Sequence, residues 1–301
     1  MNVDELVKLI KQKPYLRKMG KGSISKRYNI KPEDVVKAKN LANLGRYTPK
    51  VLIFDIETAP IKAYIWRLWK TDAHLDQIIS DWFCIAWSAK WLYSNNTMGA
   101  VLSPEEIKRE DDKRIMTSLW GLINEADIVV SHNGNKFDIP RINSRFIVNG
   151  LTPTKPFFSV DTCQIAKRQF GFSSNKLDAL ATHFNIEHKL NTDFNLWKRC
   201  LNGDKEALEY MLKYNKKDVE ILEEVYLKLR PWIKNHPNMG NLAGEQNVCS
   251  NCGSDNIHII EDKFYFTSVG KYPLYKCNEC GAISRGRKSI QNTTTINSIG
   301  R

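Results

Sequence analysis

VLIFDIETAP (residues 51–60) joins an apolar strand to two acidic side chains. Val51 to Phe54 form a β-branched and aromatic run without a charge, which predicts a strand buried in a sheet. Side chains alternate along a strand, so Asp55 and Glu57 point to the same face. Two like charges at the end of a buried strand repel each other, and this arrangement favours a divalent cation between them. The simpler alternative is a strand that ends in a polar turn.

Two later stretches, IVVSHNGNKFDIPRI (128–142) and YNKKD (214–218), carry further acidic residues. The first is a second apolar strand that runs into a polar turn containing glycine, after which Asp138 opens a helical pattern. The second places Tyr214 and Asp218 four residues apart in a long amphipathic helix, and therefore on one face of that helix. Three widely separated stretches thus each present a carboxylate in a position suited to a shared site.

In this order, the patterns D-x-E, N-G-x-x-F-D and Y-x-x-x-D resemble the three motifs of the DEDD superfamily of 3′→5′ exonucleases. The tyrosine before the last aspartate points to the DEDDy branch, and Lys213 stands where the other branch would have a histidine. The residues of the three motifs are most similar to those of the proofreading domain of family-B DNA polymerases and of its stand-alone, often phage-encoded relatives. Each motif is weak alone, whereas the ordered set is specific.

The resemblance implies catalysis by two metal ions about 3.5–4 Å apart. It implies that Asp55 bridges both ions, that Glu57 and Asp218 complete the site that activates water, and that Asp138 holds the second ion largely through water. Tyr214 would orient the attacking water with its hydroxyl. We expect Mg²⁺, with Mn²⁺ as a substitute, because all four ligands are hard oxygen donors.

Side chains next to these ligands are candidates for contacts with the terminal nucleotides of a substrate. Thr58, Asn133 and Phe137 are the residues we expect in this role. The stretch 157–190 permits two interpretations. Stand-alone members of the resembled group carry Asp-Thr and Asn-Lys-Leu-Asp patterns similar to those found here. Asp161, Asn175 and Lys176 could therefore face substrate, although helix capping is the commoner role for Asp and Asn at such boundaries. His183 and His188 are interpreted as ordinary side chains.

Four cysteines near the C-terminus form the pattern C-x₂-C, twenty-four residues, C-x₂-C, and a glycine follows each pair. Two such turns can hold one ion in a tetrahedral Cys₄ site, so the pattern predicts a zinc ribbon with strands between the pairs. A disulfide pair is the alternative, but nothing in the sequence marks secretion. The expected zinc ligands are Cys249, Cys252, Cys277 and Cys280.

The formal charge of +12 is unevenly distributed along the chain. Residues 1–50 hold ten Lys and three Arg against four acidic residues, a net charge of +9. The pattern of residues 2–12 predicts a short helix. The pattern of residues 24–40 predicts two helices with a turn at Asn29 and Ile30, and this second pattern resembles the helix-turn-helix of DNA-binding domains. The acidic Glu33 and Asp34 argue against base contacts by the second helix, and a basic helical cap on the nuclease is the alternative.

The expected fold is α/β: a ribonuclease-H-like mixed sheet flanked by helices, with a small N-terminal helix-turn-helix-like module and a C-terminal zinc ribbon. Residues 64–69, 82–93 and 97–102 read as strands and 112–126 as a helix. The eight Trp residues are expected mostly in the core, and Trp66 and Trp69 are not assigned to nucleobase stacking. The predicted domains are 1–48 (helical module), 49–235 (exonuclease), 236–248 (linker), 249–285 (ribbon) and 286–301 (basic polar tail).

Together these features predict a metal-dependent 3′→5′ exonuclease that acts on DNA and carries two Mg²⁺ or Mn²⁺ ions and one structural Zn²⁺. Alternatives are a trimmer of RNA 3′ ends and a non-catalytic DNA-binding protein. The expected partners are DNA and a DNA polymerase or another replication or recombination protein. The sequence has no signal-peptide pattern and no apolar stretch of membrane-spanning length, so we expect a cytoplasmic protein, of phage origin if the resemblance extends that far.

Overall fold

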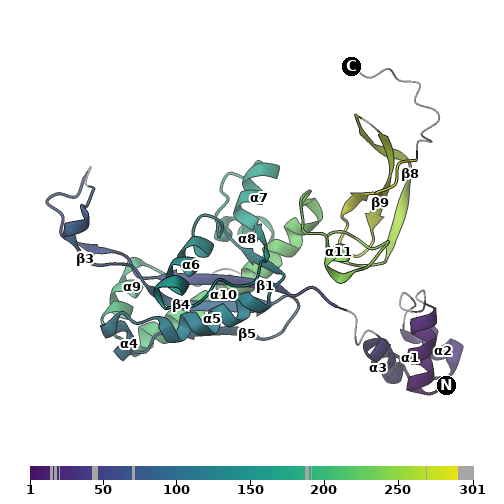
Figure 1. Ribbon diagram of the computed structural model, residues 1–301, viewed down its shortest axis with the longest axis horizontal. Helices are drawn as coiled ribbons and strands as arrows, with labels where there is room; N and C mark the ends of the chain where they lie inside the picture. The colour runs from purple at the N-terminus through teal and green to yellow at the C-terminus, as the bar shows by residue number, and fades with distance from the viewer. Residues whose placement is uncertain are drawn as a thin grey trace. The chain divides into compact units, whose positions relative to one another are not determined.

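The computed structural model describes residues 1–13, 16, 19, 21–42, 47–69, 72–186, 190, 192–268 and 270–290. The chain divides into two compact units, one formed by Pro49–Pro237 and the other by the two terminal segments Met1–Thr48 and Asn238–Arg301 (Figure 1). Residues 291–301 of the predicted tail and His188 lie outside the described residues. No helix in the described parts of the chain combines the length and the apolarity that crossing a membrane requires.

A five-stranded mixed sheet forms the centre of the unit Pro49–Pro237, in the spatial order β5-β4-β1-β6-β7. Strand β1 pairs antiparallel with β4 and parallel with β6, β4 pairs antiparallel with β5, and β6 pairs parallel with β7. The predicted mixed sheet is therefore confirmed, and the strands expected over 82–93 and 97–102 are present. The bounds are β1 (Val51–Thr58), β4 (Cys84–Trp91), β5 (Thr97–Val101), β6 (Ile128–Ser131) and β7 (Phe158–Asp161).

Helices cover both faces of this sheet. On one face, α5 packs against β4 and α6, and the Trp87 indole donates a hydrogen bond of 2.7 Å to the carbonyl of Ile115. On the other face, α10 crosses β4, β5 and β1 (Figure 1). The helix predicted over 112–126 corresponds to α5. The helices are α4 (Pro104–Arg109), α5 (Lys113–Glu125), α6 (Asp138–Val148), α7 (Thr162–Gln169), α8 (Leu177–His183), α9 (Phe194–Leu201) and α10 (Lys205–Leu229), followed by the 3₁₀ turn η3 (Arg230–Trp232).

The alternation of side chains along β1 explains why α10 becomes the helix of the acidic site. Phe54 and Ile56 are buried in the core and leave Asp55 and Glu57 on the opposite face, the one that α10 covers. The helix approaches the sheet closely, because a Cβ on Gly99 of β5 would lie 2.8 Å from Leu212 Cδ1 of α10. The carboxylates of β1 therefore lie beneath the middle of a 25-residue helix.

Residues 61–81, of which the structure describes 61–69 and 72–81, are called the arm, and the described parts extend from the sheet domain. It contains the short strands β2 (Lys62–Ala63) and β3 (Ile78–Ser80) and the 3₁₀ turn η2 (Leu75–Gln77). The prediction of a strand over 64–69 is wrong. These residues follow β2 in the chain and form no pairing with a neighbouring strand. The expected burial of its tryptophans is also wrong: Trp66 is 96% exposed and Trp69 is 83% exposed.

The N-terminal segment folds around its own small core. Helices α1 (Val3–Gln12), α2 (Lys21–Tyr28) and α3 (Pro32–Ala42) bury Leu6, Ile10, Ile24 and Val35 among them. Asn29, with φ 47, makes the turn between α2 and α3, and this left-handed conformation is one that Asn tolerates. The two helices predicted over 24–40, with a turn at Asn29, are present as α2 and α3, whereas the resemblance to a DNA-binding helix-turn-helix stays a prediction.

The C-terminal segment holds an antiparallel sheet of the order β10-β9-β8. Its long hairpin, β8 (Ile257–Thr267) and β9 (Gly270–Cys277), lies between the two cysteine pairs, as expected for a ribbon, and β10 spans Ile283–Arg285. Residues 239–243 of the predicted linker form the short helix α11 (Met239–Ala243).

Candidate active site

Strand β1 and helix α10 bring three acidic side chains together. Asp55, Glu57 and Asp218 each offer a carboxylate oxygen, and these oxygens all lie within 4.8 Å of one another. Asp55 and Glu57 are partly exposed, whereas Asp218 is 4% exposed. The sequence predicts each of these residues, and the fold places them in one group although 161 residues separate Glu57 from Asp218.

Asn215 contacts this group and was missed by the sequence reasoning. Its side-chain amide donates a hydrogen bond of 2.7 Å to Asp55 Oδ2, and the residue is fully buried. Asn215 stands three residues before Asp218, so both lie on the same side of α10. This i, i+3 spacing is the signal by which the sequence could have identified it. The hydrogen bond fixes the orientation of the Asp55 carboxylate.

Asp138, the fourth predicted ligand, lies outside the group of three carboxylates. It begins α6, is 2% exposed, and its Oδ1 accepts a hydrogen bond of 3.3 Å from the backbone amide of Ile56. Burial raises the pKa of Asp138 to about 7, and the negative charge of Asp161 adds to this effect. A cation close to Asp138 would favour the ionised form and lower this pKa again.

The turn between β6 and α6 positions Asn133. Asn133 has φ 68, and its backbone amide donates to Asp161 Oδ1 at 3.0 Å, while the amide of Asn135 donates to Asp161 Oδ2 at 3.2 Å. Gly134 is needed in this turn because a Cβ there would lie 1.9 Å from Ser131 Oγ. Asp161 Oδ1 also accepts a hydrogen bond from the backbone amide of Gln164 and so caps the N-terminus of α7. The Asp161 carboxylate therefore holds the β6–α6 turn against the start of α7.

A second anchor holds the segment around Asn175. The ring of His132 lies 2.8 Å from Thr162 Oγ1 through Nδ1 and 2.9 Å from the carbonyl oxygen of Asn175 through Nε2. This contact ties the start of α8 to the β6–α6 turn. Lys176 is exposed at the N-cap of α8, where its backbone is extended.

An open groove of about 510 Å³ begins at Thr58, the residue that follows Glu57 in β1, and none of the three grouped carboxylates lines it. Arg141 of α6 stands in it with its guanidinium 4.3 Å from the ring centre of Phe137 and 4.5 Å from that of Trp82. The same group donates a hydrogen bond of 3.2 Å to Thr58 Oγ1. The predicted residues Thr58 and Phe137 therefore surround a cation that the sequence reasoning missed. The groove is lined by Thr58, Ala59, Pro60, Ile61, Trp82, Arg141, Thr192, Asp193, Phe194 and Trp197.

Tyr214 lies one helical turn before Asp218 and is 5% exposed. Its ring contacts Trp197 edge-on, with 6.5 Å between ring centres and an interplanar angle of 73°. Because Trp197 lines the groove, this contact places Tyr214 behind the groove wall and beside the acidic group.

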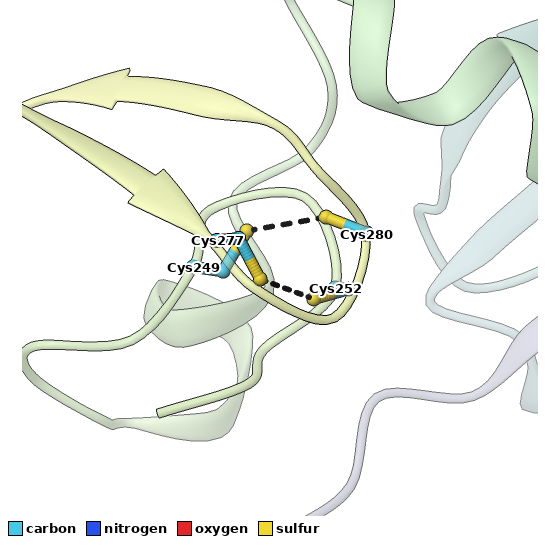
Figure 2. A group of neighbouring side chains, drawn as sticks. All are labelled: Cys249, Cys252, Cys277 and Cys280. Carbon is cyan, nitrogen blue, oxygen red and sulfur yellow. Dashed lines mark hydrogen bonds between the residues drawn. The ribbon is translucent and has the colours of Figure 1, made fainter. Parts of the chain in front are cut away.

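The two cysteine pairs have the same local geometry. In each pair the glycine that follows adopts φ 77, and its amide donates to the carbonyl of the first cysteine, at 2.9 Å for Gly253 and 3.0 Å for Gly281. These turns point all four sulfurs at one spot (Figure 2). A tetrahedral zinc with Zn–S bonds of about 2.3 Å would separate the sulfurs by about 3.8 Å. The observed distances are 3.7 Å for Cys249–Cys280 and 3.6 Å for Cys252–Cys277, far from the S–S bond length of about 2.05 Å.

The remaining three cysteines have no role in this cluster. All seven cysteines are free thiols, and Cys84, Cys163 and Cys200 are buried. Burial raises the pKa of Cys200 to about 12, and it also raises the pKa of Cys84. Cys84 and Cys200 are therefore poor nucleophiles and poor metal ligands.

The comparison with known families supports a nuclease-type hydrolase of phosphodiester bonds. Residues 91–230 match the family model described as the RNase_H superfamily. The matched range contains Asp138, Tyr214 and Asp218 but begins after Asp55 and Glu57. No curated protein matches the chain. The matched range and the five-stranded mixed sheet with its flanking helices identify a ribonuclease-H-like domain within this chain.

Proposed function

We propose that this protein is a metal-dependent 3′→5′ exonuclease that acts on DNA, of the DEDDy type. The group of Asp55, Glu57 and Asp218, with oxygens within 4.8 Å of one another, is the observation that carries this proposal. Three carboxylates this close repel one another strongly, and a divalent cation relieves that repulsion. An inert core would have no reason to keep three carboxylates together on one strand and one helix, one residue away from the groove that begins at Thr58.

The residues present fit a hard divalent cation. Every donor in the group is a carboxylate oxygen, the ligand type that Mg²⁺ and Mn²⁺ prefer. Asp55, Glu57 and Asp218 would hold the cations, and Asp138 would serve as an outer ligand from its buried position beside Ile56. Bound there, divalent cations supply activation of water and neutralisation of charge on the phosphate.

The chain's own residues orient the reacting groups. Asn215 fixes the Asp55 carboxylate through its 2.7 Å hydrogen bond. Tyr214, on the same helix, is assigned the task of orienting the attacking water with its hydroxyl. Arg141 provides a positive charge in the groove, where it would contact a phosphate, and Thr58 and Phe137 hold its guanidinium in place.

Cleavage assays with end-labelled oligonucleotides test this proposal. We expect single-stranded DNA labelled at its 5′ end to shorten stepwise from the 3′ end in Mg²⁺ and to stay intact in chelator. Asp55→Ala should abolish cleavage, whereas the matched control Glu224→Ala, an exposed acid on α10, should cleave normally. Near-normal cleavage by Asp55→Ala would refute the site. Faster shortening of RNA than of DNA would favour the trimming of RNA 3′ ends instead.

We also propose that Cys249, Cys252, Cys277 and Cys280 bind one structural zinc ion. The distances of 3.6 and 3.7 Å between sulfurs and the matched glycine turns support a tetrahedral site. The buried core around the cysteines is small, with Ala282 as its one further buried member among the described residues. Zinc binding would therefore supply much of the folding free energy of this segment.

A further inference from the structure

The arm, residues 61–81, presents an unusual concentration of exposed aromatic side chains. Within six residues, Tyr64 is 74% exposed, Trp66 is 96% exposed and Trp69 is 83% exposed. Aromatic rings normally contribute to stability by burial, whereas these three side chains are mostly exposed. A cluster of this kind on the surface marks an interaction site.

The base of the arm is built into the sheet domain. The Ser80 hydroxyl donates to Glu110 Oε1 at 2.6 Å, and the backbone amide of Tyr64 donates to the carbonyl of Gln77 at 3.0 Å. The returning part of the arm holds a local contact as well, since the amide of His74 donates to Gln77 Oε1 at 2.7 Å. Figure 1 shows the arm, labelled by β3, projecting beyond the sheet and the helices of its own unit.

The arm is continuous with the groove of the proposed active site. It begins directly after Thr58, Ala59 and Pro60 and returns at Trp82, and all four residues line the groove. Ile61, the first residue of the arm, lines the groove as well. A polymer that lies in this groove and extends past it can therefore reach the arm.

The chemistry of the arm favours a nucleic acid single strand over an acidic protein surface. The aromatic half of the arm, residues 61–69, carries Lys62 and Arg67 as its charged side chains, whereas the acidic Asp72, Asp76 and Asp81 belong to the returning half. Lys62 lies 3.9 Å from Glu110, so Arg67 is the cation that stands between the two tryptophans in sequence. Stacking on an aromatic ring tolerates every base, because every base has a π face, and interleaved cations contact the backbone phosphates. These are the properties that an exonuclease needs in order to hold strands of any sequence.

We propose that the arm binds the single-stranded part of the substrate outside the active site, with Trp66 and Trp69 stacking on bases and Arg67 contacting phosphate. This inference rests on the proposed exonuclease function, since it assigns the path of the strand that this site would cleave. It gives the protein a binding subsite that is separate from the carboxylates.

Binding measurements in chelator test the arm separately from catalysis. Fluorescence anisotropy with a labelled fifteen-nucleotide strand would compare wild type with Trp66→Ala/Trp69→Ala and Trp66→Phe/Trp69→Phe. Loss of one base stack corresponds to about a 5- to 150-fold weaker Kd, so we expect at least fivefold weakening in the alanine variant. The phenylalanine variant should bind within threefold of wild type, because phenylalanine retains a ring face. Trp232→Ala, at a 62% exposed tryptophan outside the arm, is the matched control.

The salt dependence of binding separates the two kinds of contact. Trp66→Ala/Trp69→Ala should leave the slope of log Kd against log salt unchanged, whereas Arg67→Gln should lower it by about 0.7. Unchanged binding by the alanine variant would overturn the proposal. It would equally be overturned if light scattering showed a dimer for wild type and a monomer for an alanine variant that binds DNA normally, since the arm would then be a protein interface. Because these assays need no cleavage, failure of the arm is distinguishable from failure of the exonuclease function.

Discussion

Asn215→Leu removes the hydrogen bond from Asn215 to Asp55 while keeping the number and branching of the side-chain heavy atoms. Hydrogen bonds to charged groups contribute about 1.5–3 kcal/mol, so loss of the fixed carboxylate orientation should lower the cleavage rate by about 10- to 150-fold. We also expect the Mg²⁺ concentration for half-maximal rate to rise, because Asp55 is the central proposed ligand. Single-turnover cleavage over a Mg²⁺ titration measures both quantities.

The same substitution should change stability far less than it changes rate. The amide oxygen of Asn215 is buried and makes no hydrogen bond in the described structure, which is a cost that leucine removes. Asp55 is partly exposed, so water can replace the lost donor. Thermal unfolding in chelator should therefore shift by only a few degrees. Asn143→Leu, at an exposed position of α6, is the control for adding an apolar side chain to a helix.

If the leucine variant keeps both the wild-type single-turnover rate and the wild-type Mg²⁺ dependence, the hydrogen bond from Asn215 to Asp55 has no role in cleavage. A large fall in stability together with the loss of rate would instead mean that the amide acts on the fold. Asn215→Asp extends the test, because it places a second carboxylate beside Asp55. We expect this variant to need more Mg²⁺ still, through repulsion between like charges.

Three further predictions concern other parts of the chain. Removal of only the hydroxyl in Tyr214→Phe should slow single-turnover cleavage about 10- to 1000-fold without changing DNA affinity, and an unchanged rate would mean that Tyr214 is a core aromatic. Cys277→Ser should abolish zinc binding and loosen only the C-terminal segment, as measured by metal analysis and hydrogen exchange; a protein purified without zinc would contradict the site. Burial raises the pKa of Asp138 from 3.8 to about 7, so the folded protein binds a proton that the unfolded chain releases at lower pH. In chelator, this contribution to stability is present below about pH 4 and lost as pH rises to about 7, and Asp138→Asn should flatten this part of the stability profile in denaturant titrations.

Local spacing in the sequence determined which residues could share a face. Alternation along a strand places Asp55 with Glu57, and the four-residue step in α10 places Tyr214 with Asp218. The cysteine knuckles are equally local, because each C-x₂-C-G turn closes on itself through one backbone hydrogen bond. These features depend on neighbours within a few residues, so they could be predicted without knowledge of the fold.

Tertiary structure decided which of these faces meet and which residues complete the site. Asn215 contacts Asp55 across 160 residues of sequence, and Arg141 reaches Thr58 across 83. Asp138 presents its oxygen to the amide of Ile56 and lies apart from the three grouped carboxylates. Such contacts depend on the packing of α6 and α10 against β1, which no local pattern specifies.

The arm shows most clearly where local pattern is insufficient. Residues 64–69 have the aromatic and β-branched composition of a buried strand, but a strand is stable only when a neighbour satisfies its backbone hydrogen bonds and covers its side chains. Here β1 already pairs with β4 and β6, so the sheet offers this stretch no free edge next to its own starting point. Composition alone predicted burial of Trp66 and Trp69, whereas in the fold this stretch pairs with no strand and both side chains are exposed.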